Sequence, residues 1–353
     1  MEEYIPRKHT KKIRVGDIFV GGDSPISVQS MTNTDTRDVK ATIDQIKRLE
    51  EAGCDIARLA ILDNEAAVAI GEIKKAVKIP LVADIHYDYR LAVECIKNGV
   101  DKIRLNPGNI GSNDRVRIVA SMAKERGVPI RIGVNSGSVE KGILEKFGGV
   151  TPEGMVESAL THAALLENVD FNDIAISIKA SSVSMTIAAY RLLSAKCSYP
   201  LHVGVTEAGT VYKGTIKSAV GIGCLLAEGI GDTIRVSLTG DPVEEIKAGK
   251  QILKSLGLLK EGIEIVSCPT CGRTQVNLID IANRIEPFLE KMDKNIKVAI
   301  MGCAVNGPGE AKDADIGIAG GVNEVLLFKK GQIIKKIPQE NAVEELLKEI
   351  SQM

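Results

Sequence analysis

The stretch IKNGVDKIRLN (residues 96–106) passes from a helical pattern through a glycine into a short strand pattern. The same order recurs in EEAGCDIARLA (50–60), KERGVPIRIGV (124–134) and LAEGIGDTIRVS (226–237). Glycine often ends a helix before a strand because it adopts left-handed backbone angles without strain. The recurrence therefore predicts helices and strands that alternate along the chain.

Eight runs rich in β-branched and aliphatic residues are candidate strands of this series. They span residues 26–31, 55–61, 81–86, 102–106, 130–134, 174–179, 201–205 and 233–238. Eight strand and helix units in about 240 residues match the size of a (β/α)8 barrel, or TIM barrel. A doubly wound open sheet is the alternative, but it usually has fewer strands, and the GxGxxG turn expected after an early strand is absent. We therefore predict a TIM barrel over residues 1–257.

The remainder of the chain, residues 258–353, follows a different pattern. It reads as strand, helix, strand, glycine-rich strand, hairpin and a final helix. This order predicts a small α+β domain. The domain carries the motifs SCPTCGR and MGCAVNGPGE, which contain Cys268, Cys271 and Cys303.

Composition narrows the function classes. The 353 residues carry a formal net charge of −1, which gives no bulk indication of nucleic-acid or membrane binding. The first residues lack a signal-peptide core, and no apolar run approaches the roughly 18 residues of a membrane span, so we expect a cytoplasmic protein. Seven cysteines, an odd number that includes a CxxC pair, favour a reduced compartment and a metal or redox role over a disulfide framework.

Five cationic residues stand within, or at the end of, otherwise apolar strands, toward the carboxyl ends where barrel enzymes gather functional groups. They are Arg58, Arg104, Arg131, Lys179 and Arg235. Because unpaired buried charge is costly, a ring of cations at one mouth requires anions. Arginine binds two phosphate oxygens at once, which favours a substrate with a diphosphate group. The alternative is that each cation extends its charged end to solvent or pairs with a strand-end carboxylate such as Asp55, Asp84 or Asp232.

Polar residues at the same strand ends add to this predicted mouth. They include Gln29, Ser30, Thr32, Asn33, Asp84, His86, Asn106, Asn135, Ser181 and Glu207. His86 is interpreted either as a proton carrier or as a hydrogen-bonded strand-end side chain. Glu207 is interpreted either as an acid or base among cations or as a member of a structural ion pair. His202 begins its strand, so we expect it near the barrel floor.

The three cysteines of the small domain are one thiolate short of a closed metal site. Structural zinc usually has four protein ligands, whereas a reactive centre keeps one position for substrate or a weaker ligand. All four histidines precede residue 203, so none in the small domain completes a zinc site. A [4Fe-4S] cluster with one non-cysteine ligand fits better, and Glu310 lies seven residues beyond Cys303. A zinc-knuckle-like staple and a free CxxC pair stay open as alternatives.

The other four cysteines lie singly in or beside helical segments and have no CxxC partner. They are Cys54, Cys95, Cys197 and Cys224. We expect all four to be small core residues.

Taken together, the motifs resemble a known family. The pairing of SCPTCGRT with GCAVNGPGEA, behind a barrel that carries VQSMTNTDT, ADIHYDYR, KIRLNPGNIG, RIGVNSGS and HVGVTEAG, is similar to the bacterial 4-hydroxy-3-methylbut-2-en-1-yl diphosphate synthases of the methylerythritol phosphate pathway. The resemblance spans almost the whole chain. It is to the short, two-domain form of the family, since the chain has no room for an inserted domain.

The resemblance implies an oxidoreductase of isoprenoid precursor synthesis. Its substrate would be 2-C-methyl-D-erythritol 2,4-cyclodiphosphate, whose ring is opened reductively, with loss of water, to give (E)-4-hydroxy-3-methylbut-2-enyl diphosphate. Two electrons would arrive singly from flavodoxin or ferredoxin through a [4Fe-4S] cluster. The family also implies a head-to-tail homodimer, in which the cluster domain of one subunit caps the barrel of another.

Residue roles follow from the resemblance position by position. Cys268, Cys271 and Cys303 would be the thiolate ligands, with Glu310 as a fourth, carboxylate ligand that a substrate oxygen displaces. The substrate-binding positions correspond to Arg58, Arg104, Arg131 and Lys179, with His86, Asn106, Asn135 and Ser181 nearby and Arg235 in the same cationic ring. Glu207, in the TEAG motif, matches a carboxylate that assists protonation, and the predicted catalytic set is Glu207, Glu310 and His86.

Two other function classes stay open on the residues alone. A non-redox barrel lyase or aldolase with a zinc-stapled tail would use the same cations on a phosphorylated substrate but would need no iron. A binding or scaffold module would use the tail as a metal-dependent docking domain. Iron content, and the effect of replacing Arg104 on activity, distinguish the three classes.

Overall fold

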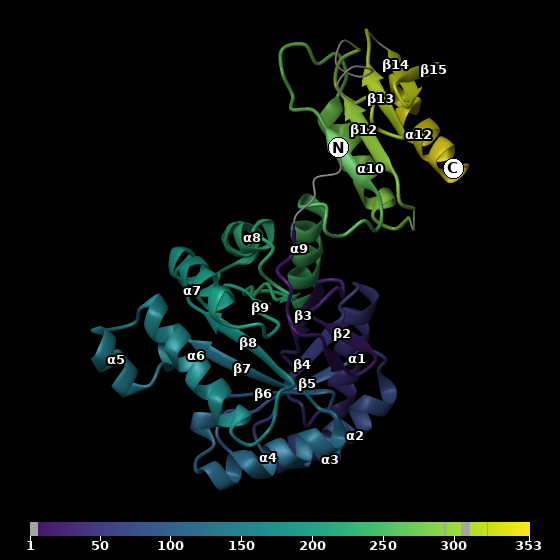
Figure 1. Cartoon of the computed structure of the whole chain (residues 1–353). Helices are drawn as coiled ribbons and strands as arrows, with labels where there is room; N and C mark the ends of the chain where they lie inside the picture. Colours follow the sequence, from purple (N-terminus) through teal and green to yellow (C-terminus); the bar gives the residue numbers. More distant parts are fainter. Residues whose placement is uncertain (1–5, 293, 305–310, 323) are drawn as a thin grey trace. The chain divides into compact units, whose positions relative to one another are not determined.

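The computed structural model of the chain describes residues 6–292, 294–304, 311–322 and 324–353. The chain divides into two compact units, Met1–Leu258 and Leu259–Met353 (Figure 1). Each unit has its own sheet and its own apolar core. The sequence analysis placed the division after residue 257.

Eight parallel strands form the main sheet in the described part of the first unit. They are β3 (Ser27–Met31), β4 (Ile56–Ala60), β5 (Leu81–Asp84), β6 (Lys102–Leu105), β7 (Ile130–Asn135), β8 (Ile174–Lys179), β9 (His202–Val203) and β10 (Thr233–Ile234). Their order is β8-β7-β6-β5-β4-β3-β10-β9, and a parallel bridge between Ile176 and Leu201 joins the two ends. The predicted TIM barrel is therefore confirmed, although β9 and β10 are shorter than predicted.

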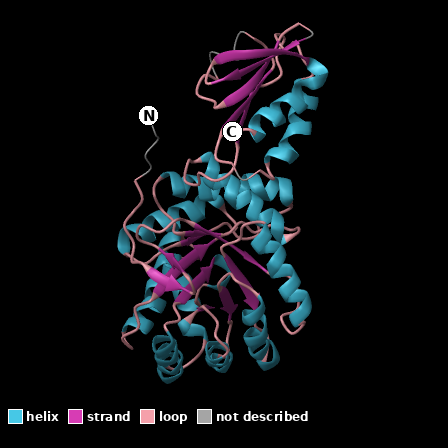
Figure 2. Cartoon of the chain, turned by 90° about the vertical axis from the view of Figure 1, so that its right-hand side faces the viewer, coloured by secondary structure: helices cyan, strands magenta, loops and turns pink. Residues whose placement is uncertain are grey.

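Helices surround these strands, as Figure 2 shows by the cyan ribbons around the magenta sheet. They are α1 (Val39–Glu51), α2 (Asn64–Ala76), α3 (Tyr89–Lys97), α4 (Asn113–Arg126), α5 (Lys141–Phe147), α6 (Pro152–Glu167), α7 (Val183–Lys196), α8 (Val211–Ala227) and α9 (Pro242–Ser255). Short 3-10 turns, Pro107–Asn109 and Ser136–Ser138, follow β6 and β7. The side chains of Asp38, Asp63 and Asp88 accept hydrogen bonds from first-turn amides and so fix where α1, α2 and α3 begin.

The glycines of the repeated helix-to-strand stretches have left-handed backbone angles. Their φ values are 82° at Gly53, 85° at Gly99, 64° at Gly127 and 75° at Gly229. Residues with a Cβ are strained in this region. At Gly229 a Cβ would also lie 2.1 Å from the carbonyl oxygen of Pro6. These glycines turn the chain from each helix into the next strand.

A hairpin closes the barrel at the amino-terminal ends of the strands. It consists of β1 (Ile13–Val15) and β2 (Ile18–Val20), which pair antiparallel. Its buried side chains join residues from the starts of three barrel strands in one apolar cluster: Ile13, Val15, Val20, Ile56, Val82 and Ala175. This cluster is the barrel floor, and burial of its apolar surface stabilises the barrel.

The second unit is a mixed sheet with helices on one face. The described strands are β11 (Glu264–Ser267), β12 (Lys297–Met301), β13 (Ile316–Gly320), β14 (Glu324–Lys329) and β15 (Gln332–Pro338), in this order across the sheet. The first two neighbouring pairs are parallel and the last two are antiparallel. α10 (Leu278–Leu289) and α12 (Ala342–Ser351), the latter preceded by a 3-10 turn at Gln339–Asn341, share one apolar core with β12, β13 and β14. The order of elements is the predicted one.

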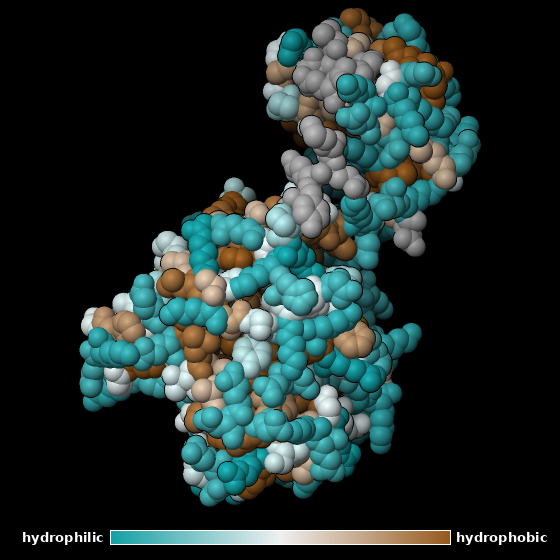
Figure 3. Space-filling model, in the orientation of Figure 1, coloured by the Kyte–Doolittle hydropathy of each residue, from teal (hydrophilic) through white to brown (hydrophobic). Residues whose placement is uncertain are grey.

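Figure 3 shows mostly hydrophilic residues on the face in view, with apolar residues scattered among them. Exposed apolar side chains include Tyr212, Ile216 and Val220, which follow one another at four-residue spacing on α8. In the described ranges, no helix combines the length and apolar character that crossing a membrane requires.

We expect the substitution Ile13→Ala to lower the free energy of unfolding by about 2–5 kcal/mol, because it leaves a cavity in the barrel floor. Ile13 is 1% exposed. The matched control is Phe19→Ala on the same hairpin, where the residue is 48% exposed and the expected loss is about 1 kcal/mol or less. Urea unfolding curves compare the two variants, and equal losses would contradict a packed floor.

Candidate active site

The candidate site lies inside the barrel, where side chains of neighbouring strands face one another. Alternate residues of a strand point to opposite faces, so every second residue faces the interior. On β4, β5 and β6 these inward residues include Arg58, Asp84 and Arg104. Asp84 Oδ1 lies 3.1 Å from Arg104 Nη1, and Asp84 Oδ2 lies 3.7 Å from Arg58 Nε. Asp84 therefore joins two of the predicted cations.

Asp84 also faces His86, whose Nε2 lies 3.7 Å from Asp84 Oδ2. Burial alone would raise the pKa of Asp84, but attraction to Arg58, the contact with His86 and attraction to Arg104 together hold that pKa well below its usual range. The carboxyl group is therefore ionised near neutral pH. The His86 side chain is 56% exposed, so it stands at the rim rather than in the interior.

Two glycines, which have no Cβ, make room for the side chains of Arg104 and Lys179. A Cβ on Gly133 of β7 would lie 2.5 Å from Arg104 Nε, and Arg104 Nη2 donates a hydrogen bond to the Gly133 carbonyl over 3.0 Å. A Cβ on Gly204, just after β9, would lie 2.6 Å from Lys179 Nζ. The sequence analysis did not single out either glycine, although glycine within a strand pattern signals a close approach of other groups.

Arg131 is placed differently from the prediction. It is the second residue of β7, so the expectation that all five cations stand toward the carboxyl ends of their strands was wrong for this residue. Its Cα nevertheless pairs in register with that of Arg104, because barrel strands are staggered. The side chain is buried, and Nη1 donates a hydrogen bond to Ser177 Oγ over 2.6 Å. The backbone of Arg131 thus stands at the level of Arg104.

Lys179 and Arg235 complete the predicted set of cations. Lys179 ends β8; burial, and then repulsion by Arg131, lowers its pKa well below the usual range. Arg235 follows β10 and forms an ion pair with Glu245 of α9, with Nε 3.4 Å from Oε2. Glu245 is 4% exposed and also accepts a hydrogen bond from Ser30 Oγ over 2.8 Å. The sequence analysis missed Glu245, because a helix pattern does not show that one of its carboxylates reaches a strand-end arginine.

Positive charge exceeds negative charge in the barrel interior. Among its described residues, six basic side chains face two carboxylates: Arg58, Lys102, Arg104, Arg131, Lys179 and Arg235 against Asp84 and Glu245. The four arginines alone outnumber the two carboxylates. Pairing with carboxylates, the alternative considered for the cations, accounts for only part of this set. A ligand with several negative charges would supply the missing partners.

The remaining predicted site residues lie around the rim. Asn106 is 5% exposed, and its Oδ1 accepts a hydrogen bond from the Gly133 N–H over 2.9 Å. Asn135 ends β7 half-buried, and Ser181 is exposed after β8. Glu207 is exposed after β9 and has a φ of 51°, a left-handed conformation rare for residues with a side chain. Such strain is concentrated at functional sites.

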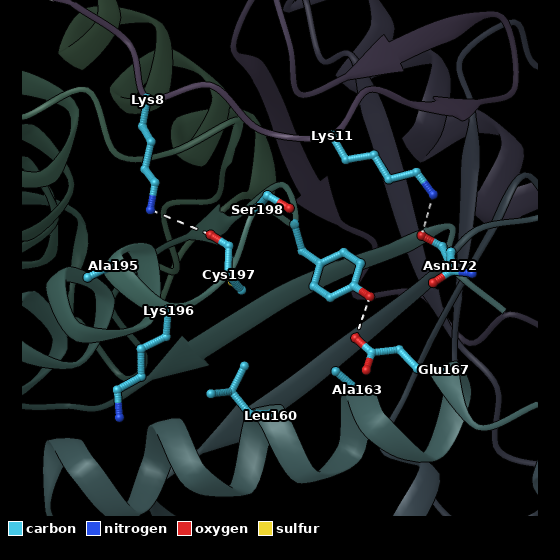
Figure 4. A pocket seen from close by; sticks show the side chains of 11 residues that line it. Lys8, Lys11, Leu160, Ala163, Glu167, Asn172, Ala195, Lys196, Cys197 and Ser198 are labelled. Atoms are coloured by element: carbon cyan, nitrogen blue, oxygen red, sulfur yellow. Dashed lines mark hydrogen bonds between the residues drawn. The ribbon is translucent and has the colours of Figure 1, made fainter. Parts of the chain in front are cut away.

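A separate hollow of about 1010 Å³ lies on the outside of the barrel (Figure 4). It is formed by α6, the turn before β9 and the N-terminal arm. There the Lys11 ammonium donates a hydrogen bond to the Asn172 carbonyl, and the Tyr199 hydroxyl donates one to Glu167. Asn172 and Tyr199 precede strands, so the hollow lies toward their amino-terminal ends, whereas barrel enzymes react at the carboxyl ends. We therefore place the candidate site at the cationic mouth.

A second group of functional residues lies at one edge of the small sheet. β11 and β12 are adjacent and parallel, with Ser267 opposite Ile300, so the loops after them leave at the same edge. Cys268 follows β11 directly, and Cys303 comes two residues after the end of β12. The Gly302 N–H donates a hydrogen bond to Cys268 Sγ over 3.1 Å. Adjacent strands therefore bring these two thiols to one edge.

Cys271 is exposed in the loop after β11. Hydrogen bonds from the backbone and then the side chain of Arg273 lower the pKa of the Cys271 thiol, which favours the thiolate. The Gln275 N–H donates to the Gly302 carbonyl over 2.9 Å and so ties this loop to the segment just before Cys303. The loops that carry the three cysteines are thus held together.

This donor set fits an iron–sulfur cluster, whose ligands are thiolates that accept hydrogen bonds from nearby N–H groups. In the described ranges, no group of three or more His, Cys, Asp or Glu side chains is arranged to hold a metal ion. Thiols lose their protons as they bind metal, so metal binding itself contributes to closing such a site. Glu310, the predicted fourth ligand, lies outside the described residues.

The other four cysteines belong to the barrel unit. Cys54 and Cys95 are buried, and burial raises the pKa of both thiols to about 12. Cys197 and Cys224 are partly exposed, so the expectation that all four are core residues was wrong for these two. Cys197 is the C-cap residue of α7, and Cys224 lies on α8. A small residue is tolerated both in a core and at such partly exposed positions, so the sequence pattern did not distinguish the two.

Comparisons with known proteins cover both units. A model of the GcpE TIM-barrel domain matches residues 10–250, and a model of the GcpE protein C-terminal domain matches residues 264–352. A 4-hydroxy-3-methylbut-2-en-1-yl diphosphate synthase (flavodoxin) from Ruminiclostridium cellulolyticum is 90% identical over 353 residues, all of both chains. The enzyme of the same name from Clostridium acetobutylicum is 65% identical over 349 residues, 99% of this chain and 100% of that one.

Solved structures resemble the barrel unit in fold alone. A type I 3-dehydroquinate dehydratase from Clostridium difficile covers 70% of this chain and 98% of its own, with a TM-score of 0.52 and 14% identity. A dihydropteroate synthase from Stenotrophomonas maltophilia covers the same shares, with a TM-score of 0.51 and 11% identity. At such low identity the likeness concerns the barrel architecture and not the reaction.

We expect Asp84→Asn to destabilise the ligand-free protein by about 3–5 kcal/mol, because it leaves two largely buried arginines, Arg58 and Arg104, without their carboxylate. Millimolar inorganic pyrophosphate should restore part of the loss by supplying negative charge at the mouth. The matched control is Asp88→Asn, which disrupts an exposed ion pair with Arg90 and should cost about 1 kcal/mol or less. Thermal and urea unfolding, with and without pyrophosphate, measure both effects; a loss that pyrophosphate leaves unchanged would contradict an anion site.

Proposed function

The chain belongs to the GcpE family, and we propose that its cationic mouth and its cysteine loops together carry out the reaction of its curated relatives. In this reaction 2-C-methyl-D-erythritol 2,4-cyclodiphosphate gains two electrons and one proton, opens its ring and loses water. The product is (E)-4-hydroxy-3-methylbut-2-enyl diphosphate, a precursor of isoprenoids. The chain is thus an oxidoreductase that acts on a small diphosphate.

The observation that carries this proposal is the excess of buried cations at the barrel mouth. A cyclic diphosphate has two negative charges, and its phosphate oxygens match the paired N–H donors of arginine. In this proposal Arg58, Arg104, Arg131, Lys179 and Arg235 bind the diphosphate, with His86, Asn106, Asn135 and Ser181 at the rim. Rigid strands hold most of these groups, so the ligand is oriented without much loss of side-chain freedom.

Glu207 and His86 are the proposed proton carriers at the rim. Loss of water requires a proton on the departing hydroxyl, and a carboxyl group or an imidazole is a common donor. The left-handed backbone conformation of Glu207 supports this role, because strained backbone is concentrated at functional sites. His86 contacts Asp84 and stands beside the phosphate-binding arginines.

We further propose that Cys268, Cys271 and Cys303 hold a [4Fe-4S] cluster, with Glu310 as a fourth ligand. The cluster would supply the electrons one at a time. A flavodoxin is the proposed electron donor because the curated relatives carry it in their names, and ferredoxin is the alternative. Electrons from such donors, and three unpaired thiols, both suit a reducing cytoplasm. The hydrogen bond from the Gly302 N–H to Cys268 Sγ supports the assignment of that thiol as a ligand.

The proposed subunit arrangement is a head-to-tail homodimer. The barrel holds the cations, whereas the small unit holds the three signature thiols, so each reaction needs one of each. In the proposed dimer, the small unit of one subunit serves the barrel of the other. A cyclic pair of such contacts closes on itself and so limits assembly to two subunits.

We expect Cys303→Ser to remove most of the iron and sulfide from the purified enzyme, because it deletes a thiolate ligand. Glu310→Ala should keep much of the cluster but lower kcat by about 100-fold. Cys224→Ser is the matched control and should leave both quantities at the wild-type level. Anaerobic iron and sulfide analysis with a flavodoxin-driven assay measures them; full activity of Glu310→Ala would overturn the ligand assignment.

Mixing two inactive variants tests the head-to-tail arrangement. Arg104→Gln damages the barrel, and Cys303→Ser damages the small unit. If each reaction uses groups from two subunits, a mixed dimer has one intact pair, and random exchange restores about a quarter of wild-type activity. If each reaction uses groups from one subunit, mixing restores nothing. Size-exclusion chromatography of the mixture confirms that dimers have exchanged.

A further inference from the structure

Lys102 is a buried lysine that the proposed function leaves without a role. It begins β6, two residues before Arg104, and side chains at this spacing share the inward face of the strand. The residue is 1% exposed. Within the described ranges, its ammonium group forms no hydrogen bond and no ion pair. Lys102 therefore lies in the interior, one step below the level of Arg104.

The groups that face Lys102 are mostly cationic. By strand, the titratable and charged groups of the interior are Arg58 on β4, Asp84 on β5, Arg104 on β6, Arg131 on β7, Lys179 on β8, His202 on β9 and Arg235 after β10, with Glu245 reaching in from α9. Asp84 is engaged by Arg58 and Arg104, and Glu245 by Arg235. No described carboxylate is left to pair with Lys102.

Neutral acceptors do not compensate for this lack. The side-chain amide of Gln29 on β3 and both ring nitrogens of His202 are buried without a hydrogen-bond partner among the described residues, so neither group hydrogen-bonds with the Lys102 amine. Nε and Nη2 of Arg131 are also buried without a partner, but they are donors and bring only positive charge. Unpaired polar groups of this kind can bind water in the interior below the mouth. They do not offset the repulsion that a further positive charge would meet there. A charged ammonium group there would face repulsion without a counterion.

Above about pH 7 the neutral amine is accordingly the favoured form of Lys102 in the empty barrel. Burial first, and then repulsion by Arg131 and Arg58, lowers its pKa to about 7. A bound diphosphate changes this balance, because its negative charges engage the same arginines that repel the ammonium form. The cations above Lys102 are then compensated, and the charged form becomes favourable.

We propose that Lys102 is a proton-linked anion-binding residue: in weakly alkaline solution it is neutral in the empty barrel, takes up one proton from solvent when a diphosphate occupies the mouth, and releases it when the diphosphate leaves. The ligand identity rests on the proposed function. The step breaks no covalent bond to carbon or phosphorus; the amine nitrogen gains a proton that the buffer or solvent loses. Lys102 thereby adds one positive charge below the ligand only while the ligand is bound.

The sign of the pH dependence follows from this exchange. Below about pH 7 Lys102 is already protonated in the empty barrel, so its contribution to binding does not vary with pH. Above that value binding takes up a proton, so the affinity for the diphosphate falls as the pH rises, until the pKa of the complex is passed. The fall should approach tenfold per pH unit for this one group.

Calorimetry of the oxidised holoenzyme tests the proposal. The cyclic diphosphate is titrated anaerobically, without an electron donor so that no turnover occurs, at pH 8 in two buffers of different ionisation enthalpy. We expect Lys102→Met to take up about one proton fewer per bound ligand than the wild type. The matched control is Lys97→Met on the outside of α3, whose lysine is 53% exposed and which should equal the wild type.

Equal proton uptake by Lys102→Met and the wild type would overturn the proposal. Absence of cyclic diphosphate binding in the wild type would instead count against the proposed function, and the same titration with inorganic pyrophosphate then tests Lys102 separately. Folding of Lys102→Met is checked by its Tm at pH 6, which should be at least that of the wild type because a buried charge without partners is removed. If that variant does not fold, Lys102→Gln replaces it in the same comparison.

Discussion

The site depends on one constraint: positive charge buried in a barrel must find negative charge. Asp84 meets part of this need, since it contacts both Arg58 and Arg104 from the strand between their strands. Glu245 meets another part at Arg235. The rest is unmet within the described barrel, and an anionic ligand is the simplest partner of sufficient charge. The preference of the mouth for a diphosphate thus arises from the cations that have no carboxylate partner in the described barrel.

The buried charges of the barrel interior are destabilising, so apolar packing elsewhere in the fold must offset their cost. TIM barrels usually fill the space between strands with branched apolar side chains. Here the inward positions at the level of the mouth are polar, and apolar burial is concentrated in the floor cluster and on the outward faces of the strands. Ile103, Leu105, Ile130 and Ile132, for example, are fully buried and alternate along β6 and β7 with the inward cations. The packing of strands against helices therefore offsets the cost of a charged interior.

The sequence predicted the helices and strands of the fold better than the height of individual side chains along the barrel axis. Alternation of apolar runs with glycine-ended helices located all eight barrel strands, because these signals are local. The level of Arg131 depends on the stagger between strands, which no single strand pattern reveals. The contact of Glu245 with Arg235 joins a helix to a strand end across the tertiary fold. Lys102 had a local signal, since its two-residue spacing from Arg104 places both side chains on the inward face. That it has no carboxylate partner depends on the arginines that pair with Asp84 and Glu245, which only the tertiary fold shows.

The two chemical tasks are divided between units that suit them. Diphosphate binding needs fixed charges in a dry environment, and a barrel whose strands are buried on both faces holds arginines rigidly. Electron transfer through thiolate ligands needs cysteines that can lose protons; in the small unit Cys268 accepts a hydrogen bond from the Gly302 N–H, and Cys271 is exposed, whereas Cys303 is buried. The buried barrel cysteines do not suit the second task, since burial raises the pKa of the Cys54 and Cys95 thiols to about 12. Burial without a neighbouring cation thus keeps these two thiols protonated, whereas hydrogen bonds from Arg273 lower the pKa of the exposed Cys271 thiol. This difference gives a physical reason for the signature cysteines to lie in the loops of the small unit.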